Sequence, residues 1–219
     1  AEPDRVIFAN ESFICIGGRA LDDGVIYTKS HKSLWLRSMF PDDQVDFALG
    51  IRNPATWIPA MFAEFGARQT FAEYLGATSP RSLLWSDYLA RLLETNPGSR
   101  IITWCNEDLP LIWPEVLRIV ADLEDDEVMA GDTDVLKEIM RPEGLGKLND
   151  YLVANPPASA EVRREITSAF LDNFVIESAI FDDINLPGWD QAMIDDLSAR
   201  YQADLDTIRN MPNVLLIEP

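Results

Sequence analysis

The chain has 219 residues, of which 47% are hydrophobic, so it is long enough to bury one full core as a single domain. Its formal net charge of −19 argues against duplex nucleic acid or an anionic membrane as the main partner, because both carry negative charge. No run of about 18 apolar residues occurs, so we expect no membrane-spanning helix.

The few cysteines and the single histidine limit which disulfides and metal sites the chain can form. Cys15 and Cys105 are the only cysteines, and both lie in apolar stretches, which predicts reduced thiols rather than a disulfide framework. With a single histidine, a structural zinc site is not expected either. We therefore expect a cytoplasmic protein without a bound metal.

The negative charge is unevenly distributed. Residues 1–100 carry 10 Lys and Arg against 12 Asp and Glu, whereas residues 101–219 carry 8 against 25. A solvated acidic surface explains this most simply. The alternative is that the acidic half binds a protein or a cationic ligand.

In the first half of the chain, short apolar runs alternate with helical patterns. The runs predict strands over residues 5–10, 25–28, 45–51 and 101–105, and the helical patterns cover residues 33–40, 54–65, 79–94 and 109–123. Pro54 suits the first turn of its helix, and Gly66 ends that helix.

From residue 124 onward the pattern is mostly helical. An acidic loop at residues 124–127 precedes helices predicted over residues 133–140, 144–154, 159–173 and 190–210, and residues 213–217 form a closing strand. In the last helix the apolar face consists of Met193, Leu197, Tyr201, Leu205 and Ile208. The alternation predicts an α/β fold with a mainly parallel sheet, in one domain over residues 1–219 whose part from 124 to 219 is mostly helical.

The strand predicted over residues 45–51 ends in Arg52 and Asn53, directly before the helix that starts at Pro54. Open α/β sheets bind ligands at the carboxyl ends of strands, and helix N-termini attract anions through unpaired N–H groups. This turn is therefore the best candidate for an anion site, most simply for a phosphate. The alternatives are a structural ion pair for Arg52 and a turn or cap role for Asn53.

A second candidate region surrounds Lys29. Residues 24–41 contain three Lys and Arg, the single histidine His31 and no acidic residue. Lys29 at the end of a strand suits an anionic group, and His31 suits a general base because its unperturbed pKa lies near neutrality. A solvated basic loop is the alternative.

These segments resemble sulfotransferases that use 3′-phosphoadenylyl sulfate, in which a strand ends in Arg-Asn-Pro, as in Ile51-Arg52-Asn53-Pro54 here. Cytosolic members carry a Lys-Thr-His motif before it, and Lys29-Ser30-His31 begins 23 residues before Arg52. The strand end at residues 106–109 also resembles the corresponding strand end of these sulfotransferases. The likeness covers about residues 1–123, and the end of the chain from residue 186 resembles bacterial sulfotransferase-like proteins.

The resemblance implies a three-layer, P-loop-type α/β domain. It implies that Arg52, with Asn53, contacts the 3′-phosphate of 3′-phosphoadenylyl sulfate or of 3′,5′-ADP. Lys29 would contact the bridging or sulfuryl oxygens, and His31 would deprotonate the hydroxyl or amine of a small-molecule or glycan acceptor.

Two alternatives to an active sulfotransferase stay open. The family's phosphosulfate loop should precede residue 5 and has no match in the chain, and Ala60 stands where the family has a serine. Either the loop lies in an upstream segment, or the chain is an inactive relic of the fold that acts as a binding protein. A nucleotide-sugar or other phosphate-handling enzyme shares the arginine but does not explain the Lys29 and His31 spacing.

Overall fold

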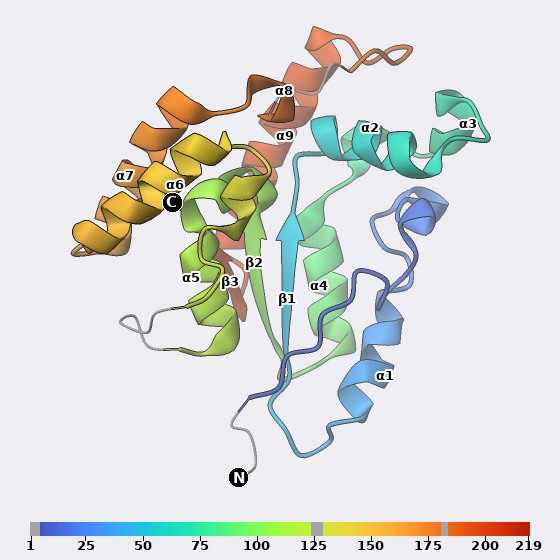
Figure 1. Ribbon diagram of the computed structural model, residues 1–219. Coiled ribbons are helices and arrows are strands. Elements are labelled where there is room, and N and C mark those ends of the chain that lie inside the picture. The colour runs from blue at the N-terminus through green and yellow to red at the C-terminus, as the bar shows by residue number, and fades with distance from the viewer. Residues whose placement is uncertain (1–4, 124–128, 181–183) are drawn as a thin grey trace. The chain divides into compact units, whose positions relative to one another are not determined.

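The computed structural model divides into two compact units, which are distinguished by the contacts within each (Figure 1). The described residues are 5–123, 129–180 and 184–219. The smaller unit comprises residues 1–7, 104–183 and 217–219, and the larger comprises residues 8–103 and 184–216. Residues 124–219, the part of the chain expected to be mostly helical, contribute to both units.

The larger unit is built on a three-stranded parallel sheet in the order β1-β2-β3. The strands are β1 (Asp46–Ile51), β2 (Arg100–Cys105) and β3 (Val214–Ile217), the last residues of β2 and β3 being counted with the smaller unit. Ile51, Ile101 and Ile102 are fully buried, as expected for apolar runs in a parallel sheet. The predicted α/β class is confirmed at this level.

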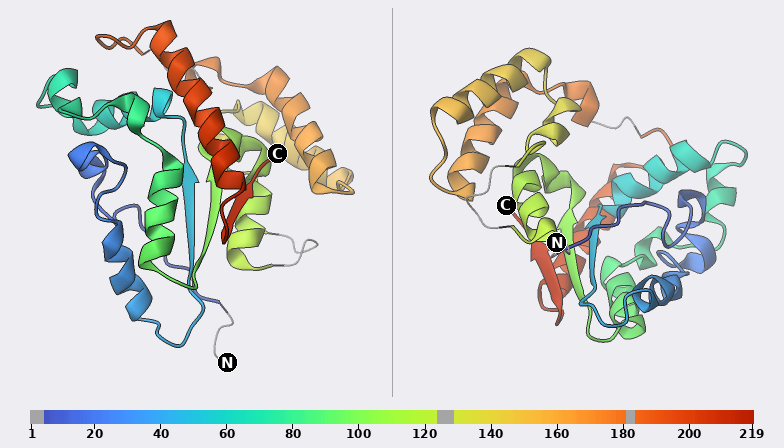
Figure 2. Two further views of the ribbon diagram at one scale, coloured as in Figure 1. Left: turned by 180° about the vertical axis from the view of Figure 1, so that it is seen from behind. Right: turned by 60° about the horizontal axis from the view of Figure 1, so that its bottom comes forward.

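The rest of the larger unit is mainly helical. Its helices are α1 (Ser33–Ser38), α2 (Pro54–Phe65), α3 (Phe71–Leu75), α4 (Trp85–Thr95) and α9 (Gln191–Arg209). Helix α9 packs against both α2 and α4, which Figure 2 shows from behind. Its apolar face is buried at Leu197, Tyr201, Leu205 and Ile208, while Met193 is partly exposed. Burial of this face fixes α9 in the larger unit.

The smaller unit is helical. Its helices are α5 (Leu109–Ala121), α6 (Pro142–Ala154), α7 (Ala160–Phe174) and α8 (Glu177–Ile180). Leu136, Met140 and Leu148 form its core, onto which the apolar side of α7 packs. Helices α6 and α7 approach closely at Gly144, where a Cβ atom would lie 2.3 Å from the Cβ of Phe174. Glycine is therefore required there.

Two of the predicted strands are not formed. Residues 5–10 have no regular structure, and Val6 and Phe8 are 59% and 61% exposed. Apolar side chains alone do not make a strand, which also needs a hydrogen-bonded neighbour, and no described strand pairs with this segment. Residues 25–28 form a turn in which Tyr27 has a φ of +49°, in the left-handed region that a strand excludes. The prediction that Lys29 ends a strand is therefore wrong.

Two helices differ from their predicted ranges by more than two residues. The helix expected from residue 79 starts as a single 3-10 turn at Pro80–Ser82, and α4 begins only at Trp85. The helix expected over residues 133–140 is a 3-10 turn at Asp134–Lys137. The other predicted helices agree with the observed ones to within about two residues, which is the usual uncertainty of helix ends. The loop predicted at residues 124–127 lies outside the described residues.

Candidate functional site

The turn that joins β1 to α2 is the most closely bonded part of the candidate site. Asn53 is the N-cap of α2, and its side-chain oxygen accepts a hydrogen bond from the Ala55 N–H at 3.0 Å. Its backbone oxygen accepts from the N–H groups of Thr56 and Trp57 at 3.0 and 2.8 Å. The first N–H groups of α2 are thus already bonded, and Pro54 has none. The expectation of unpaired N–H groups for an anion is corrected: an anion here must be held by side chains.

Arg52 is the cation at this turn. It is partly buried, and its Nε donates to Thr56 Oγ1 at 3.0 Å. Thr56 Oγ1 in turn donates to the backbone oxygen of Asn53 at 3.2 Å. The guanidinium of Arg52 is therefore oriented by Thr56, which lies four residues later in the first turn of α2.

Three side chains from other elements hold the same turn. The indole Nε1 of Trp85, the first residue of α4, donates to the Arg52 carbonyl oxygen at 2.8 Å. The indole Nε1 of Trp189 donates to the Ala55 carbonyl oxygen at 2.9 Å. Asn53 Nδ2 donates to Ser198 Oγ on α9 at 2.9 Å. The backbone around Arg52 is consequently fixed on several sides.

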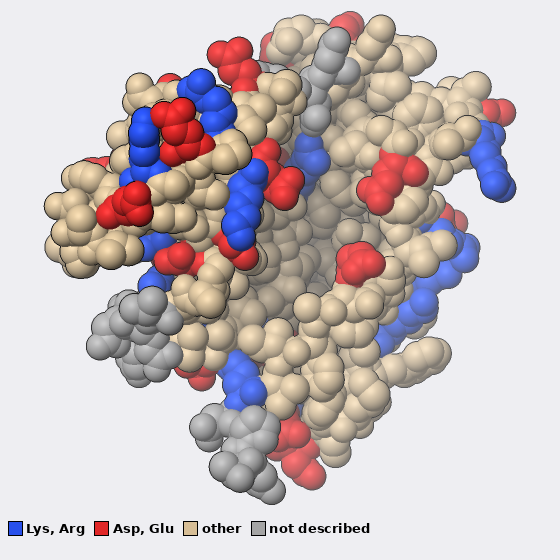
Figure 3. Space-filling view, in the orientation of Figure 1, with Lys and Arg blue, Asp and Glu red and all other residues tan. Residues whose placement is uncertain are grey.

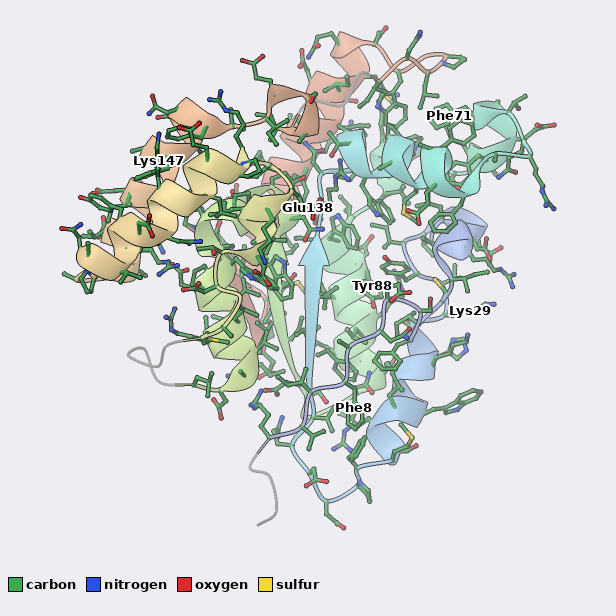
Figure 4. All side chains as sticks on the ribbon, in the orientation of Figure 1. Phe8, Lys29, Phe71, Tyr88, Glu138 and Lys147 are labelled. Atoms are coloured by element: carbon green, nitrogen blue, oxygen red, sulfur yellow. The ribbon has the colours of Figure 1, made fainter. Side chains whose placement is uncertain are left out.

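His31 lies in a 3-10 turn (Ser30–Lys32) that leads into α1, and Lys29 directly precedes that turn. Lys29 is partly buried and His31 is exposed. Neither side chain makes a hydrogen bond or an ion pair with any residue that the structure describes. Figure 4 shows the Lys29 side chain extending outward, and Figure 3 shows basic side chains gathered along this side of the unit.

The backbone of that segment is nevertheless anchored to α4. Ser33 Oγ donates to the Ser30 carbonyl oxygen at 2.6 Å and accepts from Asn96 Nδ2 at 2.7 Å. Arg91 donates to the Ile26 carbonyl oxygen at 2.5 Å. Both Ser33 and Asn96 are fully buried, so the path of the chain at Lys29 is fixed although its side chain is not.

An aromatic cluster connects the two regions. Tyr27 lies 6.1 Å from Trp57 of α2, 6.1 Å from Trp85 and 5.1 Å from Tyr88, measured between ring centroids. Trp57 and Trp85 are 4.9 Å apart. Burial raises the pKa of Tyr27 to about 12, and the nearby Cys15 thiol adds to the shift. Tyr27 precedes Lys29 by two residues, and Trp85 bonds the Arg52 carbonyl, so the cluster links the two segments through the chain. Within the described residues neither Lys29 nor His31 contacts the cluster rings through a hydrogen bond or ring interaction.

The segment at residues 106–109 belongs to the smaller unit and follows the end of β2, as predicted. It begins with a 3-10 turn (Asn106–Asp108), which was not predicted. Burial raises the pKa of the Asp108 carboxyl, and the negative charges of Glu107 and Glu218 raise it further. Both causes penalise the charged form of the carboxyl, and both arise within its own unit.

Sequence reasoning did not assign a role to Asp204, which is 5% exposed and faces the start of α4. The sequence nevertheless contains a signal for a buried role of Asp204. Asp204 follows Leu197 by seven residues, so it lies on the apolar face of α9 with Tyr201 and Ile208. A carboxylate on a buried face needs hydrogen-bond donors, and their identity depends on the tertiary structure.

Comparisons of the chain with protein-family models, with curated proteins and with solved structures found no match. Among the described residues no group of His, Cys, Asp and Glu is arranged to hold a metal ion. Over the same residues, no helix has the length and apolar character needed to cross a bilayer.

Proposed function

We propose that the chain is a sulfotransferase-like protein of the P-loop type, in which Arg52 binds the 3′-phosphate of 3′-phosphoadenylyl sulfate. One observation carries this proposal. Arg52 stands on a hydrogen-bonded turn at the carboxyl end of a parallel strand, where Trp85 holds its carbonyl oxygen. Ligands of α/β folds bind at such strand ends.

The proposed reaction assigns one step to each side chain. The acceptor, a hydroxyl or amine of a small molecule or glycan, attacks the sulfur while His31 takes its proton. The bond from sulfur to the bridging oxygen breaks, and 3′,5′-ADP leaves with that oxygen. Lys29 stabilises the negative charge that develops on it, as cations do in phosphoryl transfer. The exposed position of His31 suits a group that meets the acceptor from solvent.

Isothermal titration calorimetry with 3′,5′-ADP tests the nucleotide part of the proposal. The chain is expected to bind 3′,5′-ADP more tightly than 5′-AMP, which lacks the 3′-phosphate. Arg52→Ala is expected to lower the affinity for 3′,5′-ADP by at least about tenfold, as loss of a charge-assisted bond does, and to leave the affinity for 5′-AMP unchanged.

Arg68→Ala is the matched control, because Arg68 is an exposed arginine of the same unit, and its loss changes the net charge equally. His31→Ala should also leave nucleotide affinity unchanged, since His31 is assigned to the acceptor. Absence of heat at millimolar 3′,5′-ADP, or an equal loss in Arg52→Ala and Arg68→Ala, would contradict the assignment of Arg52.

A second candidate function, that of a binding protein on the same fold, is favoured by the surface of α1. Trp35 and Met39 are 70% and 62% exposed and border a shallow groove of about 260 Å³. Its lining residues are Phe13, Lys32, Trp35, Leu36 and Met39. An apolar groove with basic side chains beside it fits an acidic segment that carries an apolar anchor.

The binding candidate is tested by titrating a Glu-rich peptide with a central Phe into the chain and following tryptophan fluorescence. Saturable binding that is weakened by both Trp35→Ala and Lys32→Ala would support it. Binding that survives both changes, or no binding at millimolar peptide, would exclude this groove as the site.

A further inference from the structure

Helix α4 starts at a carboxylate from a distant part of the chain. Asp204 of α9 accepts hydrogen bonds from the backbone N–H groups of Trp85 and Ser86 at 2.7 and 3.3 Å, and from the Ser86 hydroxyl. The N-cap residue of α4, Leu84, provides no side-chain cap. Asp204 therefore does for α4 what a local Ser or Asp does for most helices.

This contact also explains where α4 begins. Ser79 and Pro80 are favourable helix-start residues, yet they form only a single 3-10 turn, and Leu84 is extended. The buried carboxylate satisfies the free N–H groups at residues 85 and 86 and complements the positive end of the helix there. The register of α4 is thus set by α9.

The first residue of α4 is the one that holds Arg52. Trp85 is 2% exposed, and its indole N–H donates to the Arg52 carbonyl oxygen at 2.8 Å. Its ring packs against Trp57 in the first turn of α2. The position of the indole follows from the position of the α4 N-terminus, which Asp204 fixes.

We infer that Asp204 is a positioning residue for the Arg52 site and acts through Trp85. The inference deepens the proposed function and rests on it for the ligand that Arg52 binds. Asp204 belongs to the acidic C-terminal half of the chain, yet it is buried and not part of the charged surface. On this inference the aspartate orders the anion site and does not repel the anion.

Two variants remove the two contacts with little change in volume. Asp204→Asn presents an amide to backbone donors, and Trp85→Phe keeps an aromatic ring but removes the indole N–H. Asp196→Asn is the matched control, because Asp196 is also on α9 and accepts from an arginine, Arg81, but lies at the surface.

The first readout is the Arg52 Nε–Hε signal in the ¹⁵N spectrum of the full chain, assigned by its loss in Arg52→Lys. Asp204→Asn and Trp85→Phe are each expected to shift or broaden this signal and to leave that of the exposed Arg68 unchanged. Asp196→Asn should change neither. This readout needs no nucleotide, so it decides the positioning role even if the proposed function fails.

The second readout is the affinity for 3′,5′-ADP. Asp204→Asn and Trp85→Phe should each lower it by about tenfold, and the double variant by little more than the larger single effect, because both act along one path. In an Arg52→Ala background, Trp85→Phe should not lower the affinity for 3′,5′-ADP any further.

The inference is overturned if both variants lower the melting temperature yet leave the Arg52 signal and the affinity as in the wild type, since Asp204 would then be a structural cap only. If Asp204→Asn does not fold, Trp85→Phe decides alone: an unchanged Arg52 signal overturns the inference. If the wild type does not bind 3′,5′-ADP, the proposed function fails, and the Arg52 signal still tests the positioning.

Discussion

The two halves of the candidate site are built in opposite ways. At the Arg52 turn the functional side chains themselves are bonded: Arg52 to Thr56, and Asn53 to both Ala55 and Ser198. At the Lys29 segment only the backbone is held, while the side chains of Lys29 and His31 extend from it without a bonded partner among the described residues.

The difference indicates that the two segments serve different steps of the proposed reaction. A fixed cation loses little conformational entropy when it binds a ligand group that is the same in every turnover, such as a nucleotide phosphate. An exposed histidine without a bonded partner among the described residues suits the step in which the acceptor enters and the product leaves. The following predictions test this contrast, from the largest expected effect to the smallest.

Removing the Asn53 side chain should destabilise the fold far more than removing that of Lys29. Asn53→Ala loses the cap of α2 and the bond to Ser198, at a cost of about 2 kcal/mol in the free energy of unfolding. Lys29→Ala should change it by less than about 0.5 kcal/mol, as for an unbonded side chain. Urea denaturation of both variants measures this, and equal losses would remove the contrast.

Alkaline pH should weaken the cluster that lies between the two regions. A tyrosine has a pKa of about 10 in the unfolded chain, and burial raises that of Tyr27 to about 12. Between these values the folded state holds the proton more tightly, so stability falls as the pH rises through this window. At pH 11 the loss from one such group is about 1.4 kcal/mol. Urea denaturation from pH 8.5 to 11 should show a shallower decline for Tyr27→Phe, and an identical decline would contradict the assignment.

Removing a hydrogen bond that holds the backbone near Lys29 should affect the Lys29 segment and not the Arg52 turn. Ser33→Ala removes the bond to Ser30 and the acceptor of Asn96, and we expect a loss of about 1 kcal/mol. Amide hydrogen exchange should accelerate at residues 30–36 and stay unchanged at Ala55. Faster exchange at both places would mean that the two halves are one cooperative element.

The exposed charges that join α9 to the 3-10 turn at residue 81 should contribute least. Arg81 hydrogen-bonds Asp196 and thereby lowers the pKa of that carboxyl. Because the pair lies in solvent, Arg81→Ala should leave the free energy of unfolding almost unchanged. Thermal denaturation at low and high salt checks this, and a clear fall in melting temperature that high salt abolishes would show that surface charge, and not buried polar contact, fixes α9.

The elements with local signals could be predicted from the sequence. Pro54 and Gly66 mark both ends of α2, and the spacing of Leu197, Tyr201 and Ile208 predicts the buried face of α9. Both signals depend on residues a few positions apart, so no tertiary knowledge is needed. The turn after β1 was found for the same reason.

Features that depend on distant partners could not be predicted. The apolar residues at 6–8 resemble a strand, but whether a strand forms depends on a neighbour. The start of α4 was misplaced because its cap, Asp204, is more than one hundred residues away in sequence. The availability of the N–H groups of α2 was likewise overestimated, since Asn53 occupies them.

Pro59, in the interior of α2, has a consequence for how substitutions combine in this chain. A proline cannot donate to the carbonyl four residues earlier, and here that carbonyl belongs to Ala55, which accepts the Trp189 indole N–H instead. An ordinary residue at position 59 would supply a competing donor and make the indole redundant. Pro59 and Trp189 should therefore behave as an epistatic pair: Trp189→Phe costs more beside Pro59 than in a Pro59→Ala background, so a change at position 189 is better tolerated once position 59 has changed.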